Sequence, residues 1–187
     1  MLLPLFSTTA TIALFKRFRR SRSASSAVEF ALIAPMFFAM LFALFETALI
    51  FFAGQVLENG VQDSGRKIYT DGRDAYVDAA AFKADLCKRT SELFTCDGIS
   101  VDARTYPAGT AIPTAVPYDS AGQANSALSW NVPAANAPSP STVVIRAFYQ
   151  WPLVVTQLGY NIANVNRNMS DSKRLMVATA AFRVEPR

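Results

Sequence analysis

The chain has 187 residues, including 18 lysines and arginines, 14 aspartates and glutamates, and no histidine. The absence of histidine excludes Ser-His and Cys-His nucleophile pairs and histidine-based metal sites, and the isolated glycines form no phosphate-binding loop. The net charge of +4 does not indicate nucleic-acid binding, because residues 1–24 carry five cations and the remainder has 13 basic and 14 acidic residues, a net charge of −1. We therefore expect no catalytic site, no cofactor, no bound metal and no nucleic-acid partner.

A basic leader precedes a long apolar segment. No residue from Phe30 to Phe45 is charged, and after Glu46 the apolar character resumes as far as Ala53. The 27 residues of Ala27–Ala53 would form a helix of roughly 40 Å, which can span a hydrocarbon core of about 30 Å. We predict a cytoplasmic leader (1–24), a transmembrane helix (25–54) and an extracytoplasmic head (55–187).

The distribution of charge predicts the orientation of the span. The leader has an excess of cations: Lys16, Arg17, Arg19, Arg20 and Arg22. The residues just after the span are balanced in charge: Glu58, Asp63, Arg66 and Lys67. The positive-inside bias therefore places the N-terminus in the cytoplasm and the head outside it. A cleaved secretory signal peptide fits poorly, because its apolar region of about 7–15 residues ends at small residues, where this chain has Phe51 and Phe52.

Glu29 stands at the start of the apolar run and has two interpretations. In the first, it lies at the membrane interface in the first helical turn, where the helix dipole favours a carboxylate. In the second, the chain is cut between Ala24 and Ser25, so that Glu29 becomes the fifth residue of the processed protein. This arrangement resembles the processing site of type IV pilin-like proteins. The resemblance implies cleavage by a prepilin peptidase and pairing of Glu29 with the N-terminal amine of a neighbouring subunit, although Ala24 replaces the usual glycine.

Four stretches carry a narrower resemblance. They are Ser26–Pro35, Phe45–Glu46, Gln55–Asn59 and Ala180–Pro186. In this order they resemble the TadE family, the minor pilin-like proteins of tight-adherence (Flp-type) pilus systems, over residues 24–70 and 142–187. The resemblance implies other pilin-like subunits and the pilus assembly platform as partners. It also implies a location in the bacterial inner membrane with a periplasmic or extracellular head, with or without incorporation into the pilus.

A second acidic residue of the apolar segment, Glu46, lies 17 residues beyond Glu29. That separation is about 25 Å along a helix, which places Glu46 near the opposite membrane interface. Two roles remain open from the sequence: solvation at that interface, or pairing with a basic residue of a partner subunit.

Cys87 and Cys96 are the two cysteines of the chain. An even pair in an extracytoplasmic, oxidising compartment is typical of a disulfide. Such a bridge would stabilise the head by about 2–3 kcal/mol in the chain-entropy model.

The head is predicted to be an α+β domain, with a small antiparallel sheet packed on helices. Apolar spacing favours outward continuation of the span over 54–70, a turn at Asp71–Gly72 and an amphipathic helix over Asp74–Phe94. Alternation and β-branched residues predict strands over 99–106, 142–155 and 175–184. Phe148, Tyr149 and Trp151 are expected to fill the core faces of the sheet.

Residues 107–141 contain six prolines, namely Pro107, Pro113, Pro117, Pro133, Pro138 and Pro140. A loop of this length is uncommon in a compact domain, so it is interpreted as a mobile or binding excursion.

Two functions remain open at this point. One is a processed minor pilin-like subunit that acts through helix association and its head. The other is an uncleaved, single-pass periplasmic protein that binds a ligand or an envelope partner. Cleavage at Ala24–Ser25 distinguishes them.

Overall fold

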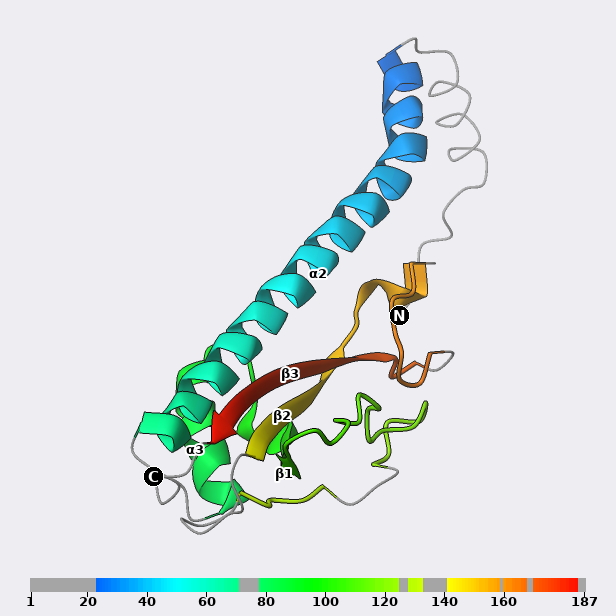
Figure 1. Ribbon diagram of the computed structural model, residues 1–187. Helices are drawn as coiled ribbons and strands as arrows, with labels where there is room; N and C mark the ends of the chain where they lie inside the picture. Colours follow the sequence, from blue (N-terminus) through cyan, green and yellow to red (C-terminus); the bar gives the residue numbers. More distant parts are fainter. Residues whose placement is uncertain are drawn as a thin grey trace, which may run out of the picture. The chain divides into compact units, whose positions relative to one another are not determined.

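The computed structural model describes residues 23–70, 78–124, 128–132, 141–158, 160–167 and 170–184. Within these residues the chain forms two α-helices, two short 3-10 helices and three strands, which are drawn in Figure 1. Their bounds are α2 Ser23–Thr70, α3 Ala79–Thr90, η2 Cys96–Gly98, β1 Ile99–Pro107, β2 Ser141–Pro152, η3 Val155–Leu158 and β3 Lys173–Val184. The chain divides into two units, residues up to Leu44 and residues from Phe45 onward. Most of the leader, and the predicted turn at Asp71–Gly72, lie outside the described residues.

The three strands form one antiparallel sheet in the order β1-β2-β3. Ile99 of β1 lies opposite Tyr149 of β2, which in turn lies opposite Met176 of β3. This arrangement confirms the predicted α+β class and the three predicted strands, whose observed ends differ from the predicted ones by at most three residues. Pro152 is the last residue of β2, where a missing N–H donor does least harm to the ladder.

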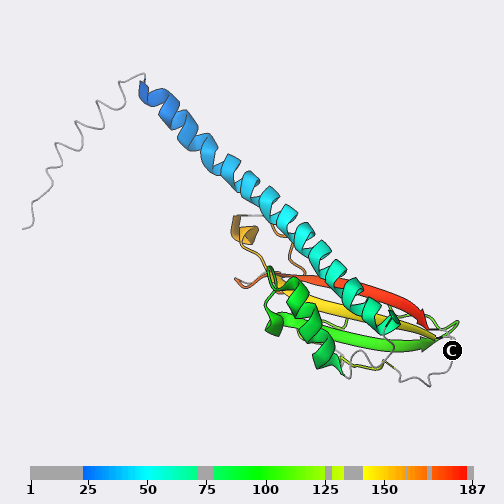
Figure 2. The same cartoon turned by 90° about the vertical axis from the view of Figure 1, so that its left-hand side faces the viewer.

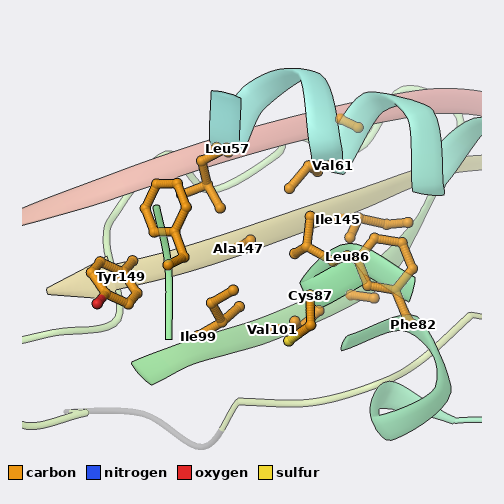
Figure 3. Close-up of a cluster of buried hydrophobic side chains, with 14 of the residues drawn as sticks. Leu57, Val61, Phe82, Leu86, Cys87, Ile99, Val101, Ile145, Ala147 and Tyr149 are labelled. Atoms are coloured by element: carbon orange, nitrogen blue, oxygen red, sulfur yellow. The ribbon is translucent and has the colours of Figure 1, made fainter. Parts of the chain in front are cut away.

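One face of the sheet is covered by α3 and by α2 from Ala53 onward, as Figure 2 shows. Buried residues of α2 recur every three or four positions: Ala53, Leu57, Val61, Ser64 and Ile68. Figure 3 shows Leu57 and Val61 above the strand residues Ile145 and Ala147, with Phe82 and Leu86 of α3 beside them. The predicted continuation of the apolar helix into the head is therefore confirmed, and it supplies one wall of the hydrophobic core.

Helix α3 begins at Ala79, directly after a residue that caps its N-terminus. The carboxylate of Asp78 accepts the backbone N–H of Ala81 at 2.8 Å, which is an N-cap. The helix ends at Thr90, four residues before the predicted Phe94, and its hydroxyl donates to the carbonyl of Leu86. Cys87 lies in the last turn, as predicted.

The second face of the sheet is partly covered by the proline-rich segment. Arg146 donates to the carbonyl of Ala115, the ring of Tyr118 contacts Phe148, and Gln150 donates to the carbonyl of Gly122. Phe148 is consequently only 1% exposed. The described parts of the predicted excursion thus pack on the sheet, because alternate residues of β2 present apolar and hydrogen-bonding groups to this face as well.

Close packing between α2 and α3 depends on Gly60. A Cβ atom at this position would lie 2.8 Å from Thr90 Cγ2 and 2.9 Å from Leu86 Cδ1, and both of those residues are buried. At Gly54 the nearest atom would be Met176 Cε at 3.8 Å, an ordinary contact. The two helices can therefore approach this closely only where α2 lacks a side chain.

Replacing Gly60 by alanine is expected to lower the free energy of unfolding by about 1–3 kcal/mol, because the core must move to admit a methyl group. The matched change Gly54→Ala should instead raise it by up to about 1 kcal/mol through helix propensity. Urea unfolding of both variants in detergent measures the difference. Equal effects of the two changes would contradict the packing role of Gly60.

Candidate functional site

The first unit presents an apolar surface around the whole circumference of α2. Its large apolar side chains are mostly exposed, among them Phe30, Leu32, Ile33, Met36 and Met40. The stretch Ser26–Ile68 contains the helix that is long and apolar enough to cross a membrane, and it is the one such helix within the described residues. A helix that is apolar on all sides requires a lipid or protein environment around it.

The predicted cleavage site lies at the beginning of α2. The backbone of Ser23, Ala24 and Ser25 is helical, and Glu29 follows one turn later with an exposed side chain. Pro35 lies inside the same helix, which continues through it to Thr70. The structure therefore places Glu29 one helical turn beyond Ser25, at the start of the apolar surface.

Glu46 lies on the second unit and binds the backbone of the β2–β3 connection. Its carboxylate accepts the N–H of Val154 at 2.5 Å and the N–H of Val155 at 3.2 Å. Val155 is the first residue of η3, so the two N–H groups are free of helical partners. The negative charge of Glu46 is stabilised by its own chain, a partner that neither sequence interpretation included.

Two further contacts join α2 to the sheet region. The hydroxyl of Thr47 donates to the hydroxyl of Tyr160 at 3.3 Å. Glu58 accepts the backbone N–H of Thr179 at 3.0 Å, on the outer edge of β3. Side chains of α2 thus satisfy backbone groups of the head that the sheet leaves open.

A buried carboxylate lies on the second face of the sheet. Asp102, which is 0% exposed, accepts hydrogen bonds from the backbone N–H of Ser129, from Arg104 and from Arg146. Burial by itself raises the pKa of Asp102, but the Ser129 N–H and the two guanidinium groups outweigh it, and the pKa is lowered. This cluster ties β1, β2 and the loop segment 128–132 together.

The stability of the head is expected to fall as the pH drops below about 4. The pKa of Asp102 is lower in the folded state than the unfolded value of about 3.9. Its contribution is therefore complete above that value and is lost as the pH falls through the folded pKa. Urea unfolding of the full chain in detergent, followed by tryptophan fluorescence between about pH 6 and pH 2.5, measures the effect.

The control for this acid dependence is Asp102→Asn. We expect the variant to lose about 3–5 kcal/mol at neutral pH, because Arg146 loses its buried partner. It should also show a weaker dependence on pH. Parallel acid curves for the variant and the wild type would show that other carboxyl groups cause the loss.

The disulfide joins Cys87 of α3 to Cys96 of η2, in the predicted pairing. It connects the end of α3 to the start of β1. Asp85 adds a polar connection between the helices, since it binds Ser64 and Lys67 of α2 as well as Arg89 of α3. Within the part of the chain that the structure describes, no group of three or more acidic or cysteine side chains could hold a metal ion.

These features define a class of protein in which an N-terminal helix is apolar enough to cross a membrane. The C-terminal part of that helix forms one wall of a small α+β head. Residues 24–66 match the family model of the TadE-like proteins. The match confirms the resemblance predicted from the sequence, over the stretch from Ala24 to the part of α2 that enters the core. A search of curated proteins and a search of solved structures each found no match. The TadE-like segment implies a role in tight-adherence pilus systems.

Sequence reasoning missed the partner of Glu46 and the burial of Asp102. The alternation of β1 correctly places Asp102 on the face opposite Val101, but it does not reveal that residues 115–124 and 128–130 contact that face. The signal in the sequence was Asp102, which lies directly opposite Arg146 in the neighbouring strand. Recognising this pair from the sequence required the register of the two strands.

Replacing Glu46 by alanine is expected to expose the amides of Val154 and Val155, because they lose their acceptor. The local opening free energy should fall by about 1–3 kcal/mol. Hydrogen exchange of the peptide covering 153–158 measures this. Glu92→Ala, which removes an exposed acid elsewhere in the head, is the matched control. Unchanged exchange in Glu46→Ala would mean that the carboxylate does not hold this segment.

Proposed function

We propose that this protein is a minor pilin-like subunit that takes part in assembling a tight-adherence (Flp-type) pilus in the bacterial inner membrane. The observation that carries the proposal is the TadE-like match at residues 24–66. That stretch contains the Ala24–Ser25 junction, Glu29 and the exposed apolar surface of α2. The role is structural, through association with other subunits, and requires no catalysis by this chain.

Processing supplies the first step of this function. The five leader cations keep residues 1–24 in the cytoplasm, where a prepilin peptidase cuts between Ala24 and Ser25. The cut removes the leader charge and creates an α-ammonium group on Ser25. A new positive charge then stands one helical turn from Glu29 in each subunit.

Pairing of charges supplies the second step. A carboxylate that enters the apolar interior of a membrane or fibre is costly unless an opposite charge or hydrogen-bond donors accompany it. The Ser25 ammonium of one subunit and the Glu29 carboxylate of its neighbour compensate each other. This pairing would set the axial offset between adjacent helices.

The exposed apolar surface of α2 supplies the association energy. Its side chains from Phe30 to Leu44 are not covered by the first unit itself. In the membrane they contact lipid, and in an assembly they contact the helices of other pilin-like subunits. The head is left to select partners outside the membrane.

The expected product of processing is a chain that starts at Ser25 when the prepilin peptidase is present and at the original N-terminus when it is absent. N-terminal sequencing and intact-mass measurement of protein from native membranes distinguish these forms. Ala24→Gly should be cut as well as the wild type, and Ala24→Phe should not be cut. A start at Met1 in both backgrounds would overturn the proposal and favour an uncleaved periplasmic binding protein.

Glu29→Gln separates processing from assembly within the same experiment. The variant keeps the size of the side chain and loses its charge. It should be cut at Ser25 and then fail to co-purify with other pilin-like subunits. Co-purification at the wild-type level would show that Glu29 is not the pairing group.

A further inference from the structure

The second unit carries exposed large apolar side chains on the part of α2 that precedes Ala53 and on the β2–β3 connection. On α2 these are Phe45, Leu49, Phe51 and Phe52, with Phe51 72% exposed. The β2–β3 connection adds Val154, which is 80% exposed, and Tyr160. We call these six residues the basal patch. The hydrogen bond between Val154 and Glu46 joins the start of this connection to α2.

The stretches of chain that carry the basal patch are uncharged, and Arg174 of β3 reaches the connection by donating to the carbonyl of Ile162. Residues 47–57 of α2 and residues 147–166 of the chain contain no aspartate, glutamate, lysine or arginine. Glu46, which directly precedes the first of these stretches, is bound by the N–H groups of Val154 and Val155. The N–H groups of Val154 and Val155 and the carboxylate of Glu46 therefore satisfy one another, which lowers the cost of placing them at the edge of a bilayer.

The length of the apolar helix places this level at the outer edge of the hydrocarbon. A core of about 30 Å needs about 20 helical residues. Counted from Phe30, the first apolar residue after Glu29, such a span ends near Leu49. Val154 is hydrogen-bonded to Glu46, three residues before that end. Its exposed side chain therefore lies at a depth where acyl chains begin.

We propose that the β2–β3 connection is a second membrane contact of this protein, with Val154 among the acyl chains and Tyr160 at the headgroup level of the bilayer that α2 spans. The inference rests on the proposed membrane-spanning role of α2. Lipid is the favoured occupant because the basal patch continues the lipid-exposed surface of the helix and carries no charge. Tyrosine is typical of the membrane interface, where its ring is apolar and its hydroxyl remains hydrogen-bonded, here to Thr47.

The test uses the full chain in vesicles of phosphatidylethanolamine and phosphatidylglycerol, with a nitroxide spin label at one added cysteine. Val154→Cys reports on the proposed contact. Ile112→Cys is the matched control, an exposed apolar position five residues after β1 ends, at the opposite end of the sheet from Pro152. Phe42→Cys, also exposed, reports on the span itself. All three positions are on the surface, and the native cysteines are joined to each other, so they do not take the label.

Collision rates with oxygen and with a water-soluble nickel complex give the depth of each label. We expect the oxygen-to-nickel ratio to be several-fold higher at positions 154 and 42 than at 112. A high ratio at 42 with ratios equal at 154 and 112 would overturn the second contact and leave the span intact. A low ratio at 42 would overturn the span and the contact together. A ratio at 154 that rises only when other pilin-like subunits are added would identify protein, and not lipid, as the occupant.

Discussion

The side chains of α2 change from exposed to buried within two residues, and this change determines where the sheet packs on the helix. Phe51 and Phe52 are exposed, whereas Ala53 is buried against the sheet and begins the row that continues through Leu57 and Val61. From Phe30 to Phe45 the helix is apolar on all sides and suits lipid, and from Ala53 onward only one side is apolar and suits a protein core. One helix therefore meets two environments, and the sheet can pack only on its outer part. The glycine at position 60 belongs to the same constraint, because it admits α3 to the shared core.

The acidic residues of α2 differ in how their charges are compensated. Glu46 and Glu58 accept backbone N–H groups of the head, from Val154 and from Thr179. Their charges attach the sheet to the helix and are used within the subunit. In the proposed assembly, pairing between subunits is assigned to Glu29, at the other end of the apolar run, because it lies one helical turn from Ser25. Backbone N–H donors of the head compensate a carboxylate within the same chain. The ammonium group created by cleavage can instead compensate a carboxylate of another chain.

Much of this architecture could be predicted from the sequence, because it depends on local periodicity. The apolar run, the continuation of the helix past residue 54, the strand alternation and the cysteine pair all leave a pattern within about 20 residues of sequence. The partner of Glu46 leaves no such pattern, since Val154 is 108 residues away. The packing of the proline-rich segment was also inaccessible, because composition identifies a loop but not the surface that receives it. The position and compartment of the first 22 residues, like the cut after Ala24, remain predictions.

The participation of α2 in the core determines how the head can be separated from the membrane. A protease or an engineered truncation that cuts between α2 and α3 would release a fragment without Leu57, Val61 and Ile68, and the core face of the sheet would be uncovered. A cut just before Ala53 would keep this wall but would leave the N–H groups of Val154 and Val155 without the Glu46 carboxylate. A soluble form of the head with both features intact must therefore begin no later than Phe45, and it carries the apolar residues of the outer span into solution. In the proposed membrane-spanning role of α2, shedding of a folded head is consequently opposed by the same helix that would anchor it.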